Sequence, residues 1–470
     1  MSQTDMPQGE NRCLLSGQQL ESTPNMASPF DMVSGFIDTP DVPPPARRMA
    51  ALLLIDTLGV AAGATRLDPS RIARDFVVDF HGAGSSEHAA PLLFDGRLAS
   101  IPGAAFAAAT QIDNLDGHDG FNPVKGHIGC AVVPALIAFS AALPDLTATA
   151  ALDTLAMSYE IGARAGLALH ATVHDYHTSG AWNALAVAAL GCRLRNASQK
   201  QLREALGIAE YHGPRSQMMR EIAHPTMLHD GSGMGALTGS MATLLALRGF
   251  EGAPAITVEA PEVCDFWQDL GTRWTILENY IKPYPVCRWT HAPLDALDGL
   301  MRRHDLTHNH IESLRIGTFA ESAALYPGMP ETTGQAQYSL AFALATLMRY
   351  GHVGPEHIAG AGLTDPEVAR LMPRISVRVE NRHNATFPQY RMADVTLTTT
   401  DGRVLKSGDT HARGGLDAPL TEAEIERKFH NFAAPTLGAE RSARIWSMRD
   451  RLLEPDARFC ELTALVTPAP

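Results

Sequence analysis

Long stretches rich in alanine and glycine dominate the first half of the chain and constrain its fold more than any other feature. Between about Ser28 and Phe250, apolar residues recur at helical spacing in residues 46–64, 147–169 and 179–195. Their apolar positions cover most of the helix circumference, which is typical of buried helices. Small residues at these positions let helix backbones pack closely and do not form the heptad pattern of a coiled coil. We therefore expect a large, buried helical domain.

The pattern changes after Lys282. Residues 311–322 and 374–382 alternate apolar and polar side chains as strands do, and residues 393–408 predict a hairpin with Asp401-Gly402 at its turn. Helical patterns separate these strands, and further helices follow them to the end of the chain. The second half therefore predicts a mixed α+β domain.

Together these patterns predict a mainly α protein with an α+β second domain. The large all-helical domain is expected to comprise residues 28–275 with 415–470, because the C-terminal helices return to it. Residues 276–414 are expected to form a smaller α+β lid domain. The polar residues 1–27 lack a basic start followed by an apolar core, so we expect a disordered tail and no secretory signal.

Charge and cysteine usage exclude several classes of function. The net charge is −13, whereas nucleic-acid binding requires clustered lysine and arginine. The six cysteines form no CxxC pair, which fits a reducing compartment better than a disulfide framework. No apolar run reaches the roughly 18 uncharged residues that span a bilayer. We therefore expect a soluble, cytoplasmic protein with neither nucleic acid nor membrane as partner.

One loop concentrates titratable side chains between two buried helices. Residues 112–128, IDNLDGHDGFNPVKGHI, lie between alanine-rich runs at residues 99–111 and 130–143. Burial and neighbouring charges move pKa values toward neutrality, as acid/base catalysis requires. A solvated surface loop would explain the three glycines but not two histidines and a lysine between core helices. The loop is therefore the first candidate active site, and its titratable residues are Asp113, Asp116, His118, Asp119, Lys125 and His127.

Two further motifs carry weaker signals. Residues 231–239, GSGMGALTG, are similar to a phosphate-binding loop, but no strand precedes them, so we expect a tightly packed helix face and no nucleotide. His170 and His174 are one helical turn apart, yet HExxH is absent and no metal is expected. His177 is either an acid or base that points into a cleft or an ordinary loop histidine.

A cationic segment at residues 280–297 marks the expected start of the second domain. Lys282, Arg288 and His291 accompany Cys287 and stiffening prolines. Clefts between domains are common ligand sites, and cations there suit a carboxylate. The alternative is a linker with solvated charges. A nucleophilic Cys287 would need a base and an orienting group, which the sequence does not show.

Several segments together resemble the MmgE/PrpD family. The matching segments occur in order over about residues 30–430. They are residues 55–64, the Asp113–His127 loop with the helix after it, and residues 158–166, 176–191, 229–254 and 281–297. The family includes 2-methylcitrate dehydratase, cis-aconitate decarboxylase and iminodisuccinate epimerase. The resemblance implies a large helical domain, a smaller α+β lid, a homodimer and no cofactor.

The resemblance also implies which residues line the active site. By position, these are Asp113, His127, His177 and Lys282. Cys287 falls where the decarboxylase branch has histidine and many other members have cysteine. We expect the substrate-binding residues to be Lys125, His118, Cys287, Arg288 and His229.

The chain departs from the family pattern at several positions. The family's MTKxxH segment is PTMLHDG here, so its lysine is replaced at Met227 or Leu228. The decarboxylase's tyrosine falls near Phe342, and Ile128 follows His127 where proline is usual. The Asp113–His127 loop is longer than in the decarboxylase and carries Lys125, somewhat as in the epimerase branch. These differences weaken the transfer of cis-aconitate decarboxylation most.

The family's reactions all stabilise negative charge on a carbon beside a carboxylate. We hypothesise that His127 and His177 act as acid and base, and that lysine and arginine side chains hold a small anionic di- or tricarboxylate. Asp113 would orient a histidine or receive a proton. Elimination of water is the first expected reaction, with epimerisation of an imino- or amino-dicarboxylate or decarboxylation of a cis-aconitate-like acid as alternatives. A non-catalytic helical scaffold is the third class of function.

Overall fold

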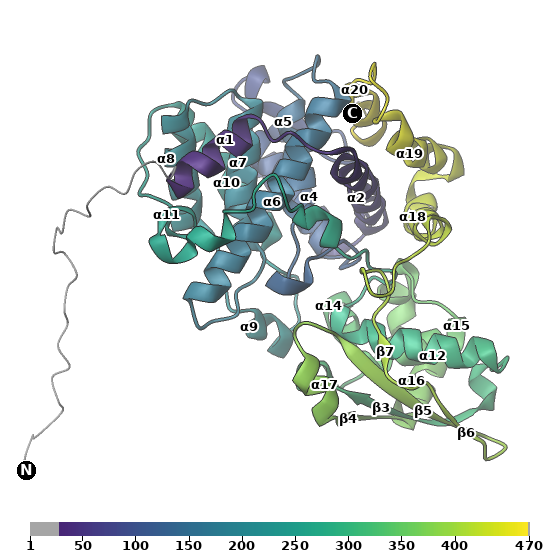
Figure 1. Cartoon of the computed structure of the whole chain (residues 1–470). Helices are drawn as coiled ribbons and strands as arrows, with labels where there is room; N and C mark the ends of the chain where they lie inside the picture. Colours follow the sequence, from purple (N-terminus) through teal and green to yellow (C-terminus); the bar gives the residue numbers. More distant parts are fainter. Residues whose placement is uncertain (1–27, 469–470) are drawn as a thin grey trace, which may run out of the picture.

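The computed structural model describes residues 28–468, so the predicted disordered tail at residues 1–27 lies outside the described residues. One group of helices forms what we call the helical body (Figure 1). Its helices are α1 (Pro29–Asp38), α2 (Pro44–Ala64), α3 (Asp68–Phe80), α4 (Ile101–Asp113), α5 (Gly129–Ser140), α6 (Ala148–Thr172), α7 (Gly180–Leu194), α8 (Gln199–His212), α9 (Met218–Ala223), α10 (Ser232–Leu247), α11 (Ile256–Glu259), α18 (Glu422–Leu437), α19 (Ala439–Arg451) and α20 (Phe459–Val466). A short hairpin of β1 (Ala89–Pro91) and β2 (Leu98–Ser100) precedes α4.

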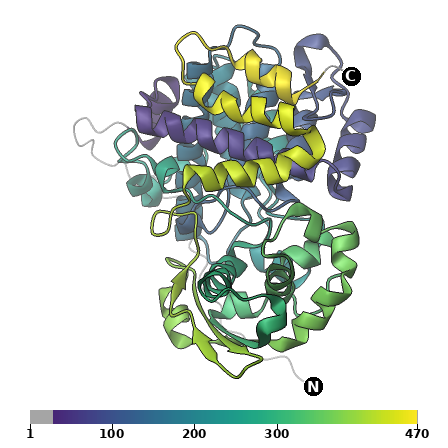
Figure 2. The same ribbon diagram turned by 90° about the vertical axis from the view of Figure 1, so that its right-hand side faces the viewer.

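The C-terminal helices return to the helical body, as the sequence predicted. Helix α2 packs against α18 and α19, and Figure 2 shows it between yellow C-terminal helices. Lys428 of α18 donates hydrogen bonds to both carboxylate oxygens of Asp56 in α2, at 2.8 and 2.6 Å, and to the carbonyl oxygen of Gly117 at 2.8 Å. A buried lysine thus links the end of the chain to α2 and to the titratable loop.

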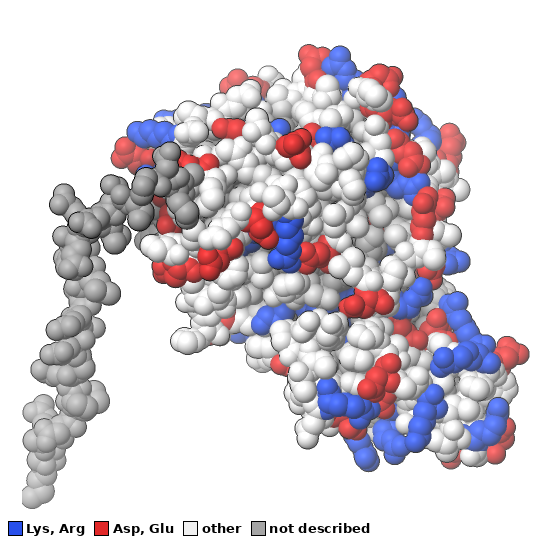
Figure 3. Space-filling view, viewed as in Figure 1, with Lys and Arg blue, Asp and Glu red and all other residues white. Residues whose placement is uncertain are grey.

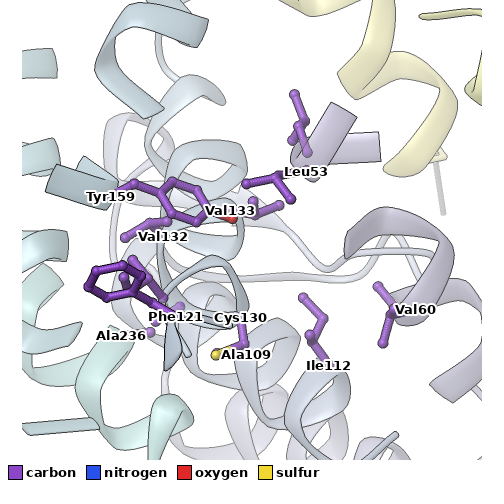
Figure 4. Packing of buried hydrophobic residues seen from close by; sticks show 14 of the residues in the cluster. Leu53, Val60, Ala109, Ile112, Phe121, Cys130, Val132, Val133, Tyr159 and Ala236 are labelled. Atoms are coloured by element: carbon purple, nitrogen blue, oxygen red, sulfur yellow. The ribbon is translucent and has the colours of Figure 1, made fainter. Parts of the chain in front are cut away.

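Small residues let the central helices approach closely. Helix α10 packs against α7, α4 and α8, and a Cβ atom at Gly235 would lie 2.8 Å from the carbonyl oxygen of Gly180. The glycine-rich segment at residues 231–239 is therefore a packed helix face, as predicted. Figure 4 shows the core beside it, where Ile112, Phe121 and Tyr159 from three different segments surround the start of α5.

The remaining helices and strands form what we call the α+β unit. Its elements are α12 (His291–Arg303), β3 (Ile311–Thr318), α13 (Ala320–Ala323), α14 (Thr333–Gln337), α15 (Leu340–Tyr350), α16 (Pro366–Leu371), β4 (Ile375–Val379), α17 (Asn381–Thr386), β5 (Met392–Thr399), β6 (Val404–Lys406) and β7 (Thr410–His411). The strand order is β4-β3-β5-β6, with β7 paired to the start of β5. Strands β3 and β4 are parallel, whereas β5 pairs antiparallel with β3, β6 and β7. Helices cover one face of this curved sheet (Figure 2).

The sheet confirms the strand predictions. Residues of β5 alternate between half-buried and buried, and the β5–β6 hairpin turns at Asp401-Gly402, where Gly402 has a φ of 88°. The fold is therefore mainly α with an α+β part, as predicted; the boundaries at residues 275 and 414 stay predictions. Among residues 28–468, no single helix is both long and apolar enough to cross a membrane, and only α2 and α3 together, bent by 94°, meet that test.

Candidate active site

The titratable loop, residues 113–128, connects α4 to α5 in a strained path. Asp116 and Lys125 adopt left-handed backbone conformations, with φ of 52° and 55°, which are uncommon for residues with a side chain. The loop pairs with the segment before α12 through Gly120 and Tyr280, whose main chains exchange hydrogen bonds of 3.0 and 2.8 Å. A Cβ at Gly120 would lie 2.8 Å from Nδ1 of His127, so the loop requires glycine here. Backbone strain of this kind accompanies functional sites.

His127 is held as a neutral base. Its Nδ1 lies 2.6 Å from the carbonyl oxygen of Asp119, which only accepts, so Nδ1 carries the proton and Nε2 keeps a lone pair. Nε2 lies 3.5 Å from Oδ2 of Asp230. The main-chain N–H of His127 donates to Oγ of Ser179 at 2.9 Å. Burial, followed by the positive charge of Lys282, lowers the pKa of His127 to about 3.

Carboxyl groups surround this imidazole and are driven toward their protonated forms. Asp113, the last residue of α4, accepts hydrogen bonds from the main-chain N–H and the hydroxyl of Ser232, both at 3.0 Å. Burial, then the charge of Asp230, raises the pKa of Asp113 well above its usual value. Burial also raises the pKa of Asp230 and lifts that of Asp119 to about 7. The site can therefore supply protons as well as accept one.

Lys282 provides a buried positive charge. Its ammonium donates to the carbonyl oxygen of Asp116 at 3.0 Å and forms an ion pair with the carboxylate of the same residue. Burial works to lower the pKa of Lys282, but the Asp116 carboxylate, together with Tyr280 and Cys287, outweighs burial and the pKa is raised. Lys282 therefore stays charged beside His127 and can stabilise negative charge in a bound molecule.

Two further histidines leave ring nitrogens without a partner. His118 is 0% exposed, both of its ring nitrogens lack a hydrogen-bond partner within residues 28–468, and its Nε2 lies 3.6 Å from Oδ1 of Asp113. Its ring centroid is 4.4 Å from that of His127. Nε2 of His229 is likewise buried without a partner in the described part of the chain. Burial lowers the pKa of both residues, that of His229 to about 4. Unpartnered buried polar atoms are expected where a ligand binds.

The same cluster contains one of the groups of side chains that could hold a metal ion. Ligand atoms of Asp116, His118 and His127 lie within 4.8 Å of one another. Neutral imidazoles suit such binding, although Lys282 already neutralises Asp116. In the pair of His170 and His174, which was considered from sequence, Nε2 of His170 is already engaged: it accepts the main-chain N–H of His177 at 3.2 Å.

Comparison with known families decides the classification. The MmgE/PrpD N-terminal domain model matches residues 36–265, and the MmgE/PrpD C-terminal domain model matches residues 284–454. The chain belongs to the MmgE/PrpD family. The first match covers most of the helical body, and the second covers the α+β unit together with α18 and α19, so the resemblance inferred from sequence is confirmed.

Three curated proteins whose sequences are similar to this MmgE/PrpD chain have related names. Cis-aconitate decarboxylase of Mus musculus is 22% identical over 71% of this chain and 72% of its own length. A cis-aconitate decarboxylase-like protein of Aspergillus oryzae is 22% identical over 91% of this chain and 94% of its own. Cis-aconitate decarboxylase of Aspergillus terreus is 23% identical over 57% and 58%. These similarities support a lyase-type enzyme.

The structure brings together most, but not all, of the residues expected from the MmgE/PrpD pattern. His118 contacts both Asp113 and His127, Lys282 pairs with Asp116 of the same loop, and His229 directly precedes Asp230, which faces His127. His177 forms no hydrogen bond or ring contact with His127; its Nδ1 lies 2.8 Å from the carbonyl oxygen of Asp175. The segment after His177 instead contributes Ser179, which bonds to His127 and to Asp230 at 2.8 Å.

The expected substrate-binding residues lie around this cluster. Arg288 lies over the ring of Tyr280, 4.2 Å from its centroid, and Tyr280 is next to His127. Nζ of half-buried Lys125 lies 4.1 Å from the ring centroid of Tyr176. Cys287 is buried, and burial raises the pKa of its thiol. Cys287 is therefore a neutral thiol rather than a nucleophilic thiolate.

Sequence reasoning missed three residues near the cluster. Asp230 faces His127. Its position directly after His229, a predicted site residue, was a signal in the sequence that could have identified it. Tyr338 lies between α14 and α15, four residues before Phe342; its hydroxyl donates to Glu221 and its ring centroid is 5.7 Å from that of His229. Arg391 precedes β5 with nothing around it in sequence that distinguishes it. Met227 and Leu228, at the position of the family's lysine, are exposed.

Proposed function

We propose that this protein is a lyase that abstracts a proton beside a carboxylate of a small di- or tricarboxylate and eliminates water. One observation carries the proposal. His127 is a neutral imidazole whose tautomer is set by the Asp119 carbonyl, so its basic Nε2 faces Asp230 and lies near the Lys282 ammonium. A positioned base, an acid and a fixed cation are what such an elimination needs.

The groups take complementary roles in the proposed step. Nε2 of His127 accepts the proton from carbon, and the electron pair forms an enolate-like species whose charge Lys282 stabilises. Protonated Asp230 or Asp113 then donates a proton to the leaving hydroxyl, which departs as water. The pKa of His127 is low in the empty site because burial penalises the imidazolium. An anionic substrate beside the ring favours imidazolium and raises that pKa during the reaction.

Two other reactions use the same groups. Decarboxylation is supported by the names of the curated relatives and by the hydroxyl of Tyr338 within the cluster. Epimerisation is supported by Lys125, two residues before His127. All three pass through negative charge beside a carboxylate, and they differ in whether water, carbon dioxide or only a proton leaves.

NMR in D₂O with a panel of hydroxy-, unsaturated and imino-di- and tricarboxylates separates these reactions. Elimination yields an unsaturated product, decarboxylation releases carbon dioxide, and epimerisation incorporates deuterium without net loss. We expect His127→Asn to lower turnover by about 10²- to 10⁴-fold, as for a lost general base. His304→Asn, at the exposed end of α12, is the matched control. Full turnover of His127→Asn would refute the assigned role.

We further propose a cytoplasmic homodimer. Exposed apolar side chains gather on neighbouring helices, with Phe76 and Phe80 on α3 and Met234 and Met241 on α10. Phe76 contacts Phe106 of α4, against which both helices pack. Exposed apolar surface of this kind favours protein association. Light scattering of wild type and Phe80→Asp tests it; a monomeric wild type contradicts the proposal.

A further inference from the structure

A small cavity lies where the titratable loop meets the α+β unit. It has a volume of about 210 Å³, and residues from both sides line it, among them Asn122, Arg288, Gln389, Arg391 and His411. The start of β5 and β7 form the edge of the sheet that faces the helical body (Figure 1). We call this cavity the arginine pocket. At this volume it is too small for a large ligand but suits one end of a small acid.

The arginine pocket adjoins the acid/base cluster. The guanidinium of Arg288 lies 4.2 Å from the ring centroid of Tyr280, and the centroid of Tyr280 lies 6.3 Å from that of His127. The charge of Arg391 also contributes to lowering the pKa of His127, after burial and Lys282. Tyr280 therefore contacts both the arginine pocket and the proposed base.

Two buried arginines in this pocket have no carboxylate partner. Arg288 and Arg391 are each 5% exposed, and the Nε of each lacks a hydrogen-bond partner among residues 28–468. Arg391 donates through Nη1 to the side chain of Asn122 and to the carbonyl oxygen of Pro388, at 3.4 Å. Arg288 donates to the carbonyl oxygens of Arg413 and Ala412, at 2.6 and 3.1 Å. Every one of these acceptors is neutral.

The surrounding charges make this arrangement unfavourable without an anion. Arg391 and Arg288 repel each other: burial lowers the pKa of Arg288 to about 10, and Arg391 adds to that effect. Two carboxylates also line the pocket, but Glu278 pairs with Arg273 at 2.8 Å and Asp417 is exposed and within 4.0 Å of neither arginine. The buried carboxylate of Asp295 offsets part of the charge of Arg288, whereas Arg391 forms no ion pair with a carboxylate of residues 28–468. In a chain of net charge −13, this excess of positive charge in the pocket favours a bound anion.

We propose that the arginine pocket binds the second carboxylate of the substrate, and that Arg391 selects acids that carry one. The inference rests on the proposed function, because it takes the ligand to be the acid that reacts at His127. Guanidinium groups bind carboxylates through paired, charge-assisted hydrogen bonds, and each of these two arginines keeps one N–H donor, at Nε, that no group of residues 28–468 accepts from. Figure 3 shows that lysine and arginine are interspersed with acidic residues on the surface. Arg288 and Arg391 differ from these surface residues, because both are buried and the Nε of each has no partner within residues 28–468.

Calorimetry with unreactive acids tests the inference without turnover. The probes are tricarballylate, succinate, butyrate and inorganic phosphate. We expect the di- and tricarboxylates to bind wild type more tightly than butyrate or phosphate. Arg391→Gln should weaken tricarballylate by about 10- to 100-fold, as for lost hydrogen bonds to a charged group, and leave butyrate unchanged. The affinity of Arg391→Lys for tricarballylate should lie between those of wild type and Arg391→Gln.

Two controls separate binding from structure. Arg403→Gln, at the exposed β5–β6 turn, should leave binding unchanged. Asn122→Ala removes the tether of Arg391 but keeps the charge, so it should weaken tricarballylate far less than Arg391→Gln. Equal tricarballylate affinity of wild type and Arg391→Gln, preference for phosphate, or no binding to wild type each overturns the inference. If tricarballylate binding depends on Arg391 but no acid of the panel exchanges protons in D₂O, the assignment of the pocket stands and the proposed reaction is refuted.

Discussion

Replacing Asp119 by asparagine tests whether burial holds protons on the carboxyl groups of the cluster. The carboxyl accepts from the hydroxyl of Tyr159 at 3.0 Å, whereas the main-chain carbonyl orients His127. Burial raises the pKa of this carboxyl from 3.8 to about 7. Because the folded-state pKa is the higher one, folding is favoured while the proton stays bound and is progressively disfavoured as pH rises between those values.

The size of the effect follows from the two pKa values. The difference between 3.8 and about 7 corresponds to about 4 kcal/mol of unfolding free energy. Of this, about 2–3 kcal/mol is lost between pH 5 and pH 8, since part is lost below pH 5. The substituted asparagine side chain would not ionise, yet it keeps an oxygen for Tyr159, and the main-chain carbonyl still orients His127. The variant should therefore lose less stability than wild type over this pH range.

Thermal unfolding at pH 5, 6, 7 and 8 measures the difference. We expect Asp119→Asn to gain a few degrees relative to wild type between pH 5 and pH 8, the shift typical of such energies in large domains. Asp265→Asn, at an exposed position, should follow wild type. Parallel pH profiles for wild type and Asp119→Asn would show that this carboxyl is not held protonated.

Other substitutions in the cluster have distinct expected outcomes. Gly120→Ala places a Cβ 2.8 Å from Nδ1 of His127, so turnover should fall by about a hundredfold with an unchanged circular dichroism spectrum. Lys282→Met leaves the Asp116 carboxylate buried alone and should lower the unfolding free energy by about 3–5 kcal/mol; adding Asp116→Asn should restore part of it in thermal denaturation. Cys287→Ser should keep turnover within about threefold, because the buried thiol is not a thiolate. Dialysis against EDTA should leave turnover unchanged, and recovery of lost turnover by added zinc would instead show that the imidazoles hold a metal.

The fold was predictable where its causes are local. Helix α8 is an example, because Ser198 and Gln201, three positions apart, form a reciprocal capping box at its start. The sequence alone identifies Ser198 as the N-cap residue. The β5–β6 hairpin likewise follows from alternation and Asp401-Gly402. The close approach of Gly235 to Gly180 was not predictable in the same way, because it depends on how two distant helices cross.

The site was predictable only in part for the same reason. The loop was found because its acids and bases are adjacent in sequence. Its partners come from far along the chain: Ser232 bonds to Asp113 across 119 positions and Lys282 to Asp116 across 166. Lys282 was found through its neighbours in the 280–297 segment. Arg391 had no such signal, because one arginine before a strand is ordinary until the structure shows that it is buried without a counterion.

The arrangement of charges indicates how the site must operate. Arg391 comes from the α+β unit and Lys282 from the segment before α12, whereas His127 and Asp113 come from the helical body, so catalysis as proposed needs all of these parts together. His127, Asp113 and Lys282 are each at most 7% exposed, so we expect the entry of a substrate to require the protein to open around them. An anion bound between the arginines would offset the repulsion between Arg288 and Arg391. Binding of the correct acid is therefore expected to stabilise the arginine pocket in the arrangement that the structure shows.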